Sequence, residues 1–194
     1  MALTPSTMLP LKTKAPSFSL PDVVSGKKVS LDDFENKKAF LVMFICRHCP
    51  YVQHIKEELS KLGRDYQKKD IAIVAISSND AGNYPEDSPV SLKEFAREIG
   101  LGYPLLYDET QSAAKSYTAA CTPDFFLFDS ARNLIYRGQL DDSRPGNGKP
   151  VTGKDLRGAM DAVLSGKVPD FVQRPSMGCN IKWKPGNEPN YFGH

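Results

Sequence analysis

The sequence predicts an α/β protein with a central mixed β-sheet flanked by helices. Two uninterrupted apolar runs, residues 40–45 and 71–77, have the length and composition of buried strands. A later run, residues 134–138, follows a turn and predicts an antiparallel partner for the strand before it. Between the first two runs, apolar residues recur every three or four positions, as in a helix that buries one face. These residues are Val52, Ile55, Leu59, Leu62 and Tyr66.

The N-terminal part predicts an arm followed by a hairpin. Residues 1–14 are rich in Pro and Thr and are expected to form a loose arm. Residues 15–20 alternate like a short edge strand, and residues 28–31 predict its partner beyond a Gly-containing turn. Residues 32–38 predict a short helical turn that leads into the first buried strand.

The middle of the chain predicts a loop, a helix and two short elements. Residues 78–90 are polar and follow a strand end, so they form a candidate active-site loop. Ser91 is the expected N-cap of a helix that ends at Gly100. Residues 103–107 then predict a short strand, and residues 111–117 a short helix.

The last part of the domain contains another apolar strand, residues 124–129, and its antiparallel partner. Residues 140–150 are polar and predict a solvated loop, although the charged side chains of the loop offer a second possibility, contact with a substrate. These side chains are Asp141, Asp142 and Arg144. Thr152 is the expected cap of a final helix that ends at Gly166.

The C-terminal tail, residues 167–194, is rich in Pro and Gly but also carries large apolar side chains such as Phe171 and Trp183. This composition is too apolar for a simple disordered segment. We expect the tail to wrap the domain or a partner subunit. Cys179 in the tail has two interpretations, a resolving thiol or a packed, inert cysteine.

Composition narrows the class of protein. At 194 residues, with 40% hydrophobic and 25% charged residues, the chain predicts one globular domain, residues 15–166, between the arm and the tail. The formal net charge of +2 gives no reason to expect nucleic acid or a membrane as a partner. No run approaches the roughly 20 apolar residues of a membrane span, and the N-terminus lacks the pattern of a signal peptide. We therefore expect a cytoplasmic location, where the four cysteines are expected to be catalytic or metal-binding.

The central motif is Cys46-Arg47-His48-Cys49-Pro50, between the first buried strand and the first long helix. Pro50 suits the first helical position, which places Cys49 at or next to the N-cap. The free N–H groups of a helix start favour a thiolate, and Arg47 and His48 are expected to favour it further by charge or hydrogen bonding. Two alternatives remain, a pair of inert buried cysteines and a structural zinc site. The zinc ligands would be drawn from Cys46, His48, Cys49 and Cys121.

This strand–CxxC–helix arrangement resembles the active site of the thioredoxin superfamily, and most closely its alkyl hydroperoxide reductase / thiol-specific antioxidant (redoxin) group. The opening A-P-x-F-x-L of residues 15–20 is similar to the start of redoxin domains. The resemblance implies a thioredoxin-like fold. A gapless alignment places Cys49 on the family's nucleophile and Val52 where the resolving cysteine would stand, so Cys46 is an extra thiol. The family's buried acidic proton acceptor falls on Met43 and is therefore missing.

The resemblance also implies that Pro123, at the start of an apolar strand, is the superfamily's cis-proline facing the reactive cysteines. Cys121 is then expected near Cys46 and Cys49, either as a third redox thiol or as a small apolar filler. The peroxiredoxin signature P-x-x-x-T/S-x-x-C, anchored on Cys49, finds Val42 and Cys46 at its Pro and Thr/Ser positions. The loss of that hydroxyl weakens the case for a peroxidase.

Three functions follow, and the first is favoured. In the first, Cys49 attacks a protein or small-molecule disulfide and Cys46 resolves the mixed disulfide. In the second, Cys49 reduces a peroxide and becomes a sulfenic acid. In the third, the chain is a metal carrier on the same fold, with histidine ligands drawn from His48, His54 and His194. The favoured function needs a cellular thiol reductant and no cofactor or metal, and a homodimer is a possible assembly.

Overall fold

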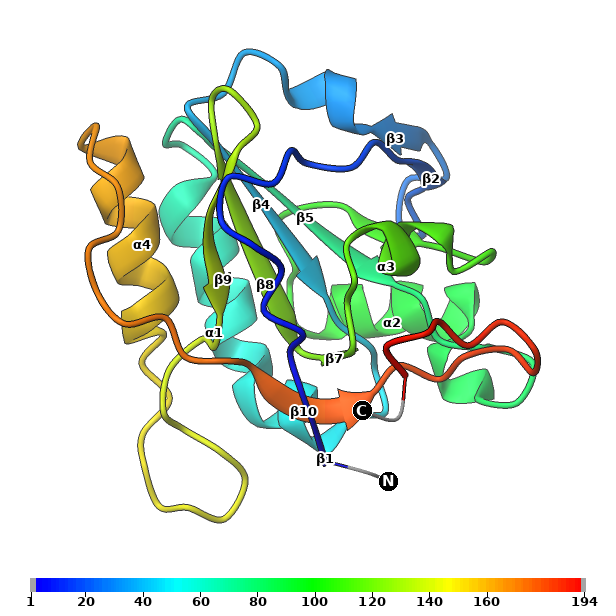
Figure 1. Ribbon diagram of the computed structural model, residues 1–194. Coiled ribbons are helices and arrows are strands. Elements are labelled where there is room, and N and C mark those ends of the chain that lie inside the picture. Colours follow the sequence, from blue (N-terminus) through cyan, green and yellow to red (C-terminus); the bar gives the residue numbers. More distant parts are fainter. Residues whose placement is uncertain (1–2, 193–194) are drawn as a thin grey trace.

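The computed structural model describes residues 3–192, and its core is a five-stranded mixed sheet in the order β6-β5-β4-β8-β9 (Figure 1). Strands β4, β5 and β6 pair in parallel, whereas β8 and β9 run antiparallel to their neighbours. The predicted mixed sheet flanked by helices is confirmed. The sheet strands are Ala39–Phe44 (β4), Ile71–Ser77 (β5), Leu105–Tyr107 (β6), Asp124–Asp129 (β8) and Leu134–Gly138 (β9).

The helices and the remaining strands surround this sheet (Figure 1). The α-helices are Pro50–Tyr66 (α1), Pro89–Glu98 (α2), Ser112–Ser116 (α3) and Lys154–Leu164 (α4), and short 3-10 helices span Leu31–Phe34 (η1) and Pro85–Asp87 (η2). Outside the main sheet lie Leu3–Pro5 (β1), Ser19–Pro21 (β2), Lys28–Ser30 (β3), Cys121–Thr122 (β7) and Met177–Asn180 (β10). Strands β2 and β3 pair antiparallel, which confirms the predicted N-terminal hairpin.

Successive side chains of β4 point to opposite faces of the sheet, so the core consists of two layers, one on each face. Leu41 and Met43 pack with apolar side chains of α1, α2 and α4. Phe40, Val42 and Phe44 belong to the other layer, which includes side chains of η1, α3 and the C-terminal tail. Full burial of each such side chain stabilises the fold by about 1.5–3 kcal/mol. Because both faces of β4 are covered, its end is a rigid support for the loop that follows.

Two predicted helix caps are wrong. Helix α2 begins three residues earlier than expected, because Pro89 occupies its first turn and the Ser88 side chain accepts a hydrogen bond from the Ser91 backbone N–H. The N-cap of α4 is Gly153, one residue after Thr152, whose hydroxyl accepts the Lys154 backbone N–H at 3.3 Å. The Asp141 carboxylate also accepts the backbone N–H groups of Thr152 and Gly153, each at 2.6 Å. A carboxylate of the preceding loop thus holds the start of α4.

The two ends of the chain meet in a second, three-stranded sheet of order β1-β10-β7. Figure 1 shows β10 between β1 and β7, beside the N-terminal end of α1. Strand β10 is antiparallel to both neighbours, with Cys179 opposite Leu3 on one side and Thr122 on the other. The tail therefore lies against the domain at the place where β7 leads into β8. The expectation of a loose N-terminal arm is wrong, because Leu3–Pro5 pairs with β10 and the Lys12 N–H donates to the Leu134 carbonyl at 2.8 Å. The limits of arm, domain and tail stay a prediction.

Within residues 3–192, no helix combines the length and the apolar character that crossing a bilayer requires.

Candidate redox site

The reactive loop lies between β4 and α1, as the sequence predicts. Cys49 is the N-cap residue of α1 with extended backbone angles, and Pro50 occupies the first turn of the helix. The Cys49 carbonyl accepts the first helical hydrogen bond, from the Gln53 N–H at 2.9 Å. The Cys49 sulfur is thereby held beside the free N–H groups of the helix start.

A cis peptide bond joins Thr122 to Pro123, which confirms the isomer predicted for Pro123. The Thr122 carbonyl oxygen lies 3.1 Å from the Cys49 sulfur, which donates to it as a thiol. The Thr122 hydroxyl lies 3.3 Å from the Cys46 sulfur. Both cysteines of the CxxC motif therefore face the β7–β8 junction. Their catalytic roles stay predictions.

A third cysteine reaches the same place from the tail. Pairing of β10 with β7 sets Cys179 opposite Thr122, whose carbonyl oxygen lies 3.1 Å from the Cys49 sulfur. Sequence reasoning left the role of Cys179 open and gave no means of placing it. The relevant signal is the Gly next to it, Gly178, because only a residue without a side chain fits against β7 there.

Hydrogen bonding makes Cys49 the acidic thiol of the cluster. The S–H of Cys46 is the largest influence, and together with donors from Cys179 and the Val52 backbone it lowers the pKa of Cys49 to about 5, against the opposing effect of burial. Burial and the hydrogen bond to Cys49 raise the pKa of Cys46 well above its ordinary value and that of Cys179 to about 12. One thiolate flanked by two thiols is therefore the favoured state of the reduced protein.

Arg47 does not have the expected role. Its guanidinium points to α2, where it donates to the Ser91 carbonyl and the Glu94 carboxylate, each at 3.0 Å. The positive charge is thus paired with a carboxylate of another helix. The sulfur is stabilised instead by S–H and N–H donors.

His48 is held by a buried carboxylate, Asp87 of η2, which also accepts the backbone N–H of Arg47 at 2.7 Å. The hydrogen bond that His48 donates to the Asp87 carboxylate is the main cause that raises the pKa of His48. Burial acts to raise the pKa of Asp87, but hydrogen bonds from His48 and Asn79 outweigh it and lower that pKa. The ring of Tyr84 stacks on His48 with centroids 5.6 Å apart. His48 thus connects the CxxC loop to residues 78–90, the predicted candidate active-site loop.

Asp87 is the residue that sequence reasoning missed. The sequence shows it only as one of several acidic residues in a polar loop. In the structure it is fully buried and ties the CxxC loop to η2 through Arg47, His48 and Asn79. It positions the loop, and its carboxylate lies within 4.8 Å of the Cys46 sulfur.

Cys121 is a less reactive thiol. Burial is the main cause that raises its pKa well above the ordinary value, and its S–H lies 3.6 Å from the Pro123 carbonyl oxygen. Val52 and Met43, which take the places of the family's resolving cysteine and proton acceptor, are both fully buried among apolar side chains. Of these three, Val52 contributes to the site through its backbone N–H.

The charged residues of the loop after β9 have structural partners. Asp141 caps α4, and Asp142 pairs with Lys154 at 2.8 Å. Arg144 donates to backbone carbonyls of its own loop. His54, a candidate ligand of the metal-carrier alternative, is half-buried, and its Nε2 lies 2.7 Å from the Ser143 hydroxyl. These contacts stabilise the loop, and His194 lies outside the described residues.

Among residues 3–192, one group of side chains could hold a metal ion: Cys46, His48 and Asp87 each offer a ligand atom within 4.8 Å of the others. A structural zinc site ordinarily needs four protein ligands. Cys49 and Cys121 are not part of this group, so the predicted four-residue combination is not formed.

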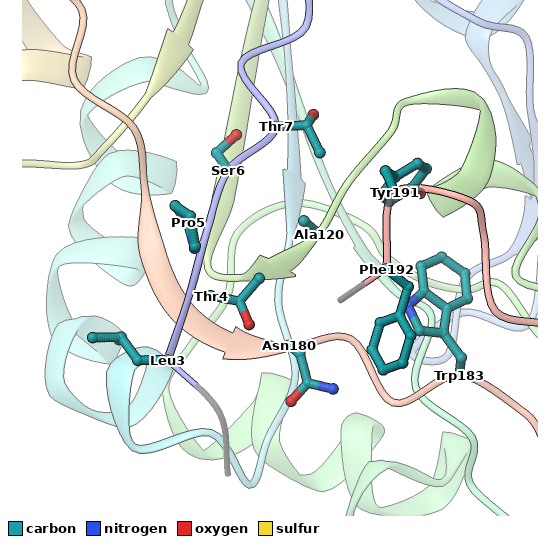
Figure 2. A pocket seen from close by; sticks show the side chains of 10 residues that line it. All are labelled: Leu3, Thr4, Pro5, Ser6, Thr7, Ala120, Asn180, Trp183, Tyr191 and Phe192. Atoms are coloured by element: carbon teal, nitrogen blue, oxygen red, sulfur yellow. The ribbon is translucent and has the colours of Figure 1, made fainter. Parts of the chain in front are cut away.

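A cavity of about 460 Å³ lies between β1 and the C-terminal tail. Figure 2 shows Leu3 and Pro5 on one side and Trp183, Tyr191 and Phe192 on the other. Ala120 and Asn180, the chain neighbours of two of the cysteines, also line it. No cysteine is among its lining residues, so this cavity is separate from the thiol cluster.

The sheet order, the cis-proline and the cysteine pair at a helix start define a thioredoxin-like protein. The chain belongs to the AhpC/TSA family, which it matches over residues 11–137.

Two solved structures show how far the similarity extends. A crystal structure of an uncharacterized conserved protein from Geobacillus kaustophilus is 53% identical with a TM-score of 0.94, covering 96% of this chain and 98% of the other. The solution structure of a putative thioredoxin from Neisseria meningitidis is 25% identical with a TM-score of 0.60, covering 79% and 91%.

Among curated relatives, the thiol-disulfide oxidoreductase ResA of Bacillus thuringiensis subsp. konkukian is 27% identical over 128 residues, which are 63% of this chain. The match spans 65% of the relative's own length.

Proposed function

We propose that the chain is a thiol–disulfide oxidoreductase in which Cys49 is the nucleophile and Cys46 the resolving thiol. The observation that carries the proposal is the Cys49 sulfur at the start of α1, 3.1 Å from the Thr122 carbonyl oxygen, with the Cys46 sulfur 3.3 Å from the hydroxyl of the same Thr122. A thiolate is the attacking species in disulfide exchange, and this arrangement provides one near neutral pH. The curated relatives named thiol-disulfide oxidoreductase support the same reaction.

The reaction transfers two electrons from the cysteine pair to a disulfide. The Cys49 thiolate attacks one sulfur of the substrate, a new S–S bond forms, and the other sulfur leaves as a thiolate that takes a proton from solvent. Cys46 then loses its proton and attacks the Cys49 sulfur, which releases the second substrate thiol. The products are two substrate thiols and a Cys46–Cys49 disulfide, which a cellular thiol reductant returns to the dithiol. The proposal includes a cytoplasmic setting, because cytosolic thiols supply that reductant.

The direct test is the reaction of fully reduced protein with oxidised glutathione, followed by peptide mass mapping. We expect rapid formation of a disulfide that includes Cys49, complete loss of the reaction in Cys49→Ser, and an unchanged reaction in the matched control Cys121→Ser. A reaction at the rate of a free thiol, or one that persists in Cys49→Ser, would contradict the proposal.

A thiol-dependent peroxidase is the alternative within the same family. Two observations favour disulfide exchange over it. The hydroxyl next to the cysteine pair, that of Thr122, lies against Cys46, and the Arg47 guanidinium is bound to Glu94 on α2. Oxidation by hydrogen peroxide orders of magnitude faster than that of a free thiol, and abolished by Cys49→Ser, would favour the peroxidase.

The group of Cys46, His48 and Asp87 supports a second function, metal binding. Thiolate and imidazole ligands suit zinc or copper(I). Elemental analysis of protein purified without added metal tests this function. Stoichiometric metal that is lost in His48→Ala would favour a carrier and argue against disulfide exchange, because bound Cys46 is not free to resolve.

A further inference from the structure

The tail strand β10 places a third cysteine on the nucleophile. Cys179 lies opposite Thr122 in the β10–β7 ladder, and the Thr122 carbonyl oxygen is 3.1 Å from the Cys49 sulfur. Cys46 approaches Cys49 from the loop before α1, whereas Cys179 approaches it from the tail. The nucleophile therefore has two thiol neighbours on separate parts of the chain.

The position of Cys179 is enforced by the structure on both sides of it. A Cβ added to Gly178 would lie 2.0 Å from the Thr122 carbonyl oxygen, so β10 sits as close to β7 as a glycine allows. Before Cys179, the Ser176 carbonyl accepts the Ser6 N–H at 2.9 Å. After it, the Ile181 N–H donates to the Ala120 carbonyl at 3.0 Å. This strand holds its cysteine in one place.

The nucleophile is buried together with both of its thiol neighbours. Cys49 is 0% exposed, Cys46 1% and Cys179 3%. A substrate disulfide therefore reaches the Cys49 sulfur only when the segments around it move apart.

We propose that Cys179 is a second resolving thiol, so that Cys49 forms alternative disulfides with Cys46 and with Cys179. This inference rests on the proposed disulfide exchange and extends it to the tail. Cys179 loses its proton, attacks the Cys49 sulfur of a mixed disulfide, and releases the bound substrate as a thiol. Against a Cys46–Cys49 disulfide the same attack frees Cys46, which takes the proton, and no net oxidation occurs. The Cys49–Cys179 bond joins β10 to the start of α1.

Cys121 provides the internal control. It is as buried as Cys179 and lies on the strand that pairs with β10, but its S–H faces the Pro123 carbonyl oxygen at 3.6 Å. If burial near the site were enough for exchange, Cys121 and Cys179 would react alike. Their different positions predict different reactivity: Cys121 lies against the Pro123 carbonyl oxygen, whereas Cys179 lies opposite Thr122, beside Cys49.

The test uses Cys46→Ser, in which the first resolving thiol is absent. Reduced full-length protein is treated with oxidised glutathione, and the products are mapped by peptide mass. We expect a Cys49–Cys179 disulfide in Cys46→Ser and also in the matched control Cys46→Ser/Cys121→Ser. In Cys46→Ser/Cys179→Ser we expect complete loss of that peptide and accumulation of Cys49 bound to glutathione.

The outcomes distinguish the two levels of inference. If Cys46→Ser stops at the glutathione adduct, as the double variant does, the Cys179 role is wrong and the proposed function stands. If Cys49 forms no adduct in any variant, the proposed function fails as well. Circular dichroism checks that each variant is folded. Should Cys46→Ser not fold, limited oxidation of the wild type replaces it, and a Cys46–Cys49 disulfide without any Cys49–Cys179 bond would overturn the inference.

Discussion

Removal of the Cys46 thiol tests the account of how Cys49 becomes acidic. The S–H of Cys46 is the strongest influence that lowers the pKa of Cys49 to about 5. A hydrogen bond to a charged group contributes about 1.5–3 kcal/mol, and one pKa unit corresponds to about 1.4 kcal/mol. Cys46→Ala should therefore raise the pKa of Cys49 by about 1–2 units, to roughly 6–7. The Val52 N–H and Cys179 remain as donors, so we do not expect a return to the ordinary value of about 8.5.

The assay is the rate of alkylation of Cys49 by iodoacetamide as a function of pH, with the modified peptide identified by mass. Ultraviolet absorbance of the thiolate gives an independent titration. Cys121→Ala is the matched control and should leave the midpoint unchanged, because its S–H faces a carbonyl oxygen. An unchanged midpoint in Cys46→Ala, or a wild-type midpoint near that of an ordinary thiol, would refute the reasoning.

The same pKa predicts how stability depends on pH. The folded pKa of Cys49, about 5, lies below the unfolded value of about 8.5. Ionisation of Cys49 therefore contributes its full stabilisation above about pH 8.5, and this contribution is lost as the pH falls through 5. Between these limits, the free energy of unfolding of the reduced wild type should rise relative to Cys49→Ser by about 1.4 kcal/mol per pH unit. Urea unfolding at several pH values measures the difference, and a difference independent of pH would contradict the prediction.

Three further predictions concern the surroundings of the site. Asp87→Asn should lower the pKa of His48 towards about 6.5, because the raising hydrogen bond loses its charge; NMR titration of the ring protons measures this, and an unchanged pKa would contradict it. Asp124, whose pKa burial raises to about 7, destabilises the fold once it ionises, so Asp124→Asn should increase the free energy of unfolding at pH 8 by about 4 kcal/mol and have little effect below about pH 4. Urea unfolding at the two pH values checks this, and equal effects at both would exclude it. Gly178→Ala should lower the free energy of unfolding by about 1–3 kcal/mol, because its Cβ would meet a carbonyl oxygen of β7 at 2.0 Å; in the control Gly158→Ala the nearest atom is 3.9 Å away, and equal stability of the two variants would argue against the tight β10–β7 contact.

The local pattern of the sequence was sufficient for the main elements of the domain. Apolar runs predict β4 and β5, and the spacing of Val52, Ile55 and Leu59 predicts the buried face of α1, because a strand and a helix repeat with different periods. Pro50 also places Cys49 at the helix start from local sequence alone, because a proline, which has no N–H, suits the first position of a helix. The cis-proline followed from the resemblance, which joins two motifs that lie far apart in the chain.

Only the tertiary structure decided what surrounds the sulfur. Arg47 turns to α2 because carboxylates lie there, and Asp87 reaches His48 because the loop after β5 folds back on the CxxC loop. The pairing of β10 with β7 depends on backbone hydrogen bonds between segments far apart in sequence, and such pairing leaves little periodic trace in a strand as short as Met177–Asn180. Local periodicity records which face of an element is buried, but not which distant element buries it. The chain alone therefore predicts Cys49 as the nucleophile, whereas the approach of Cys179 comes from the folded structure.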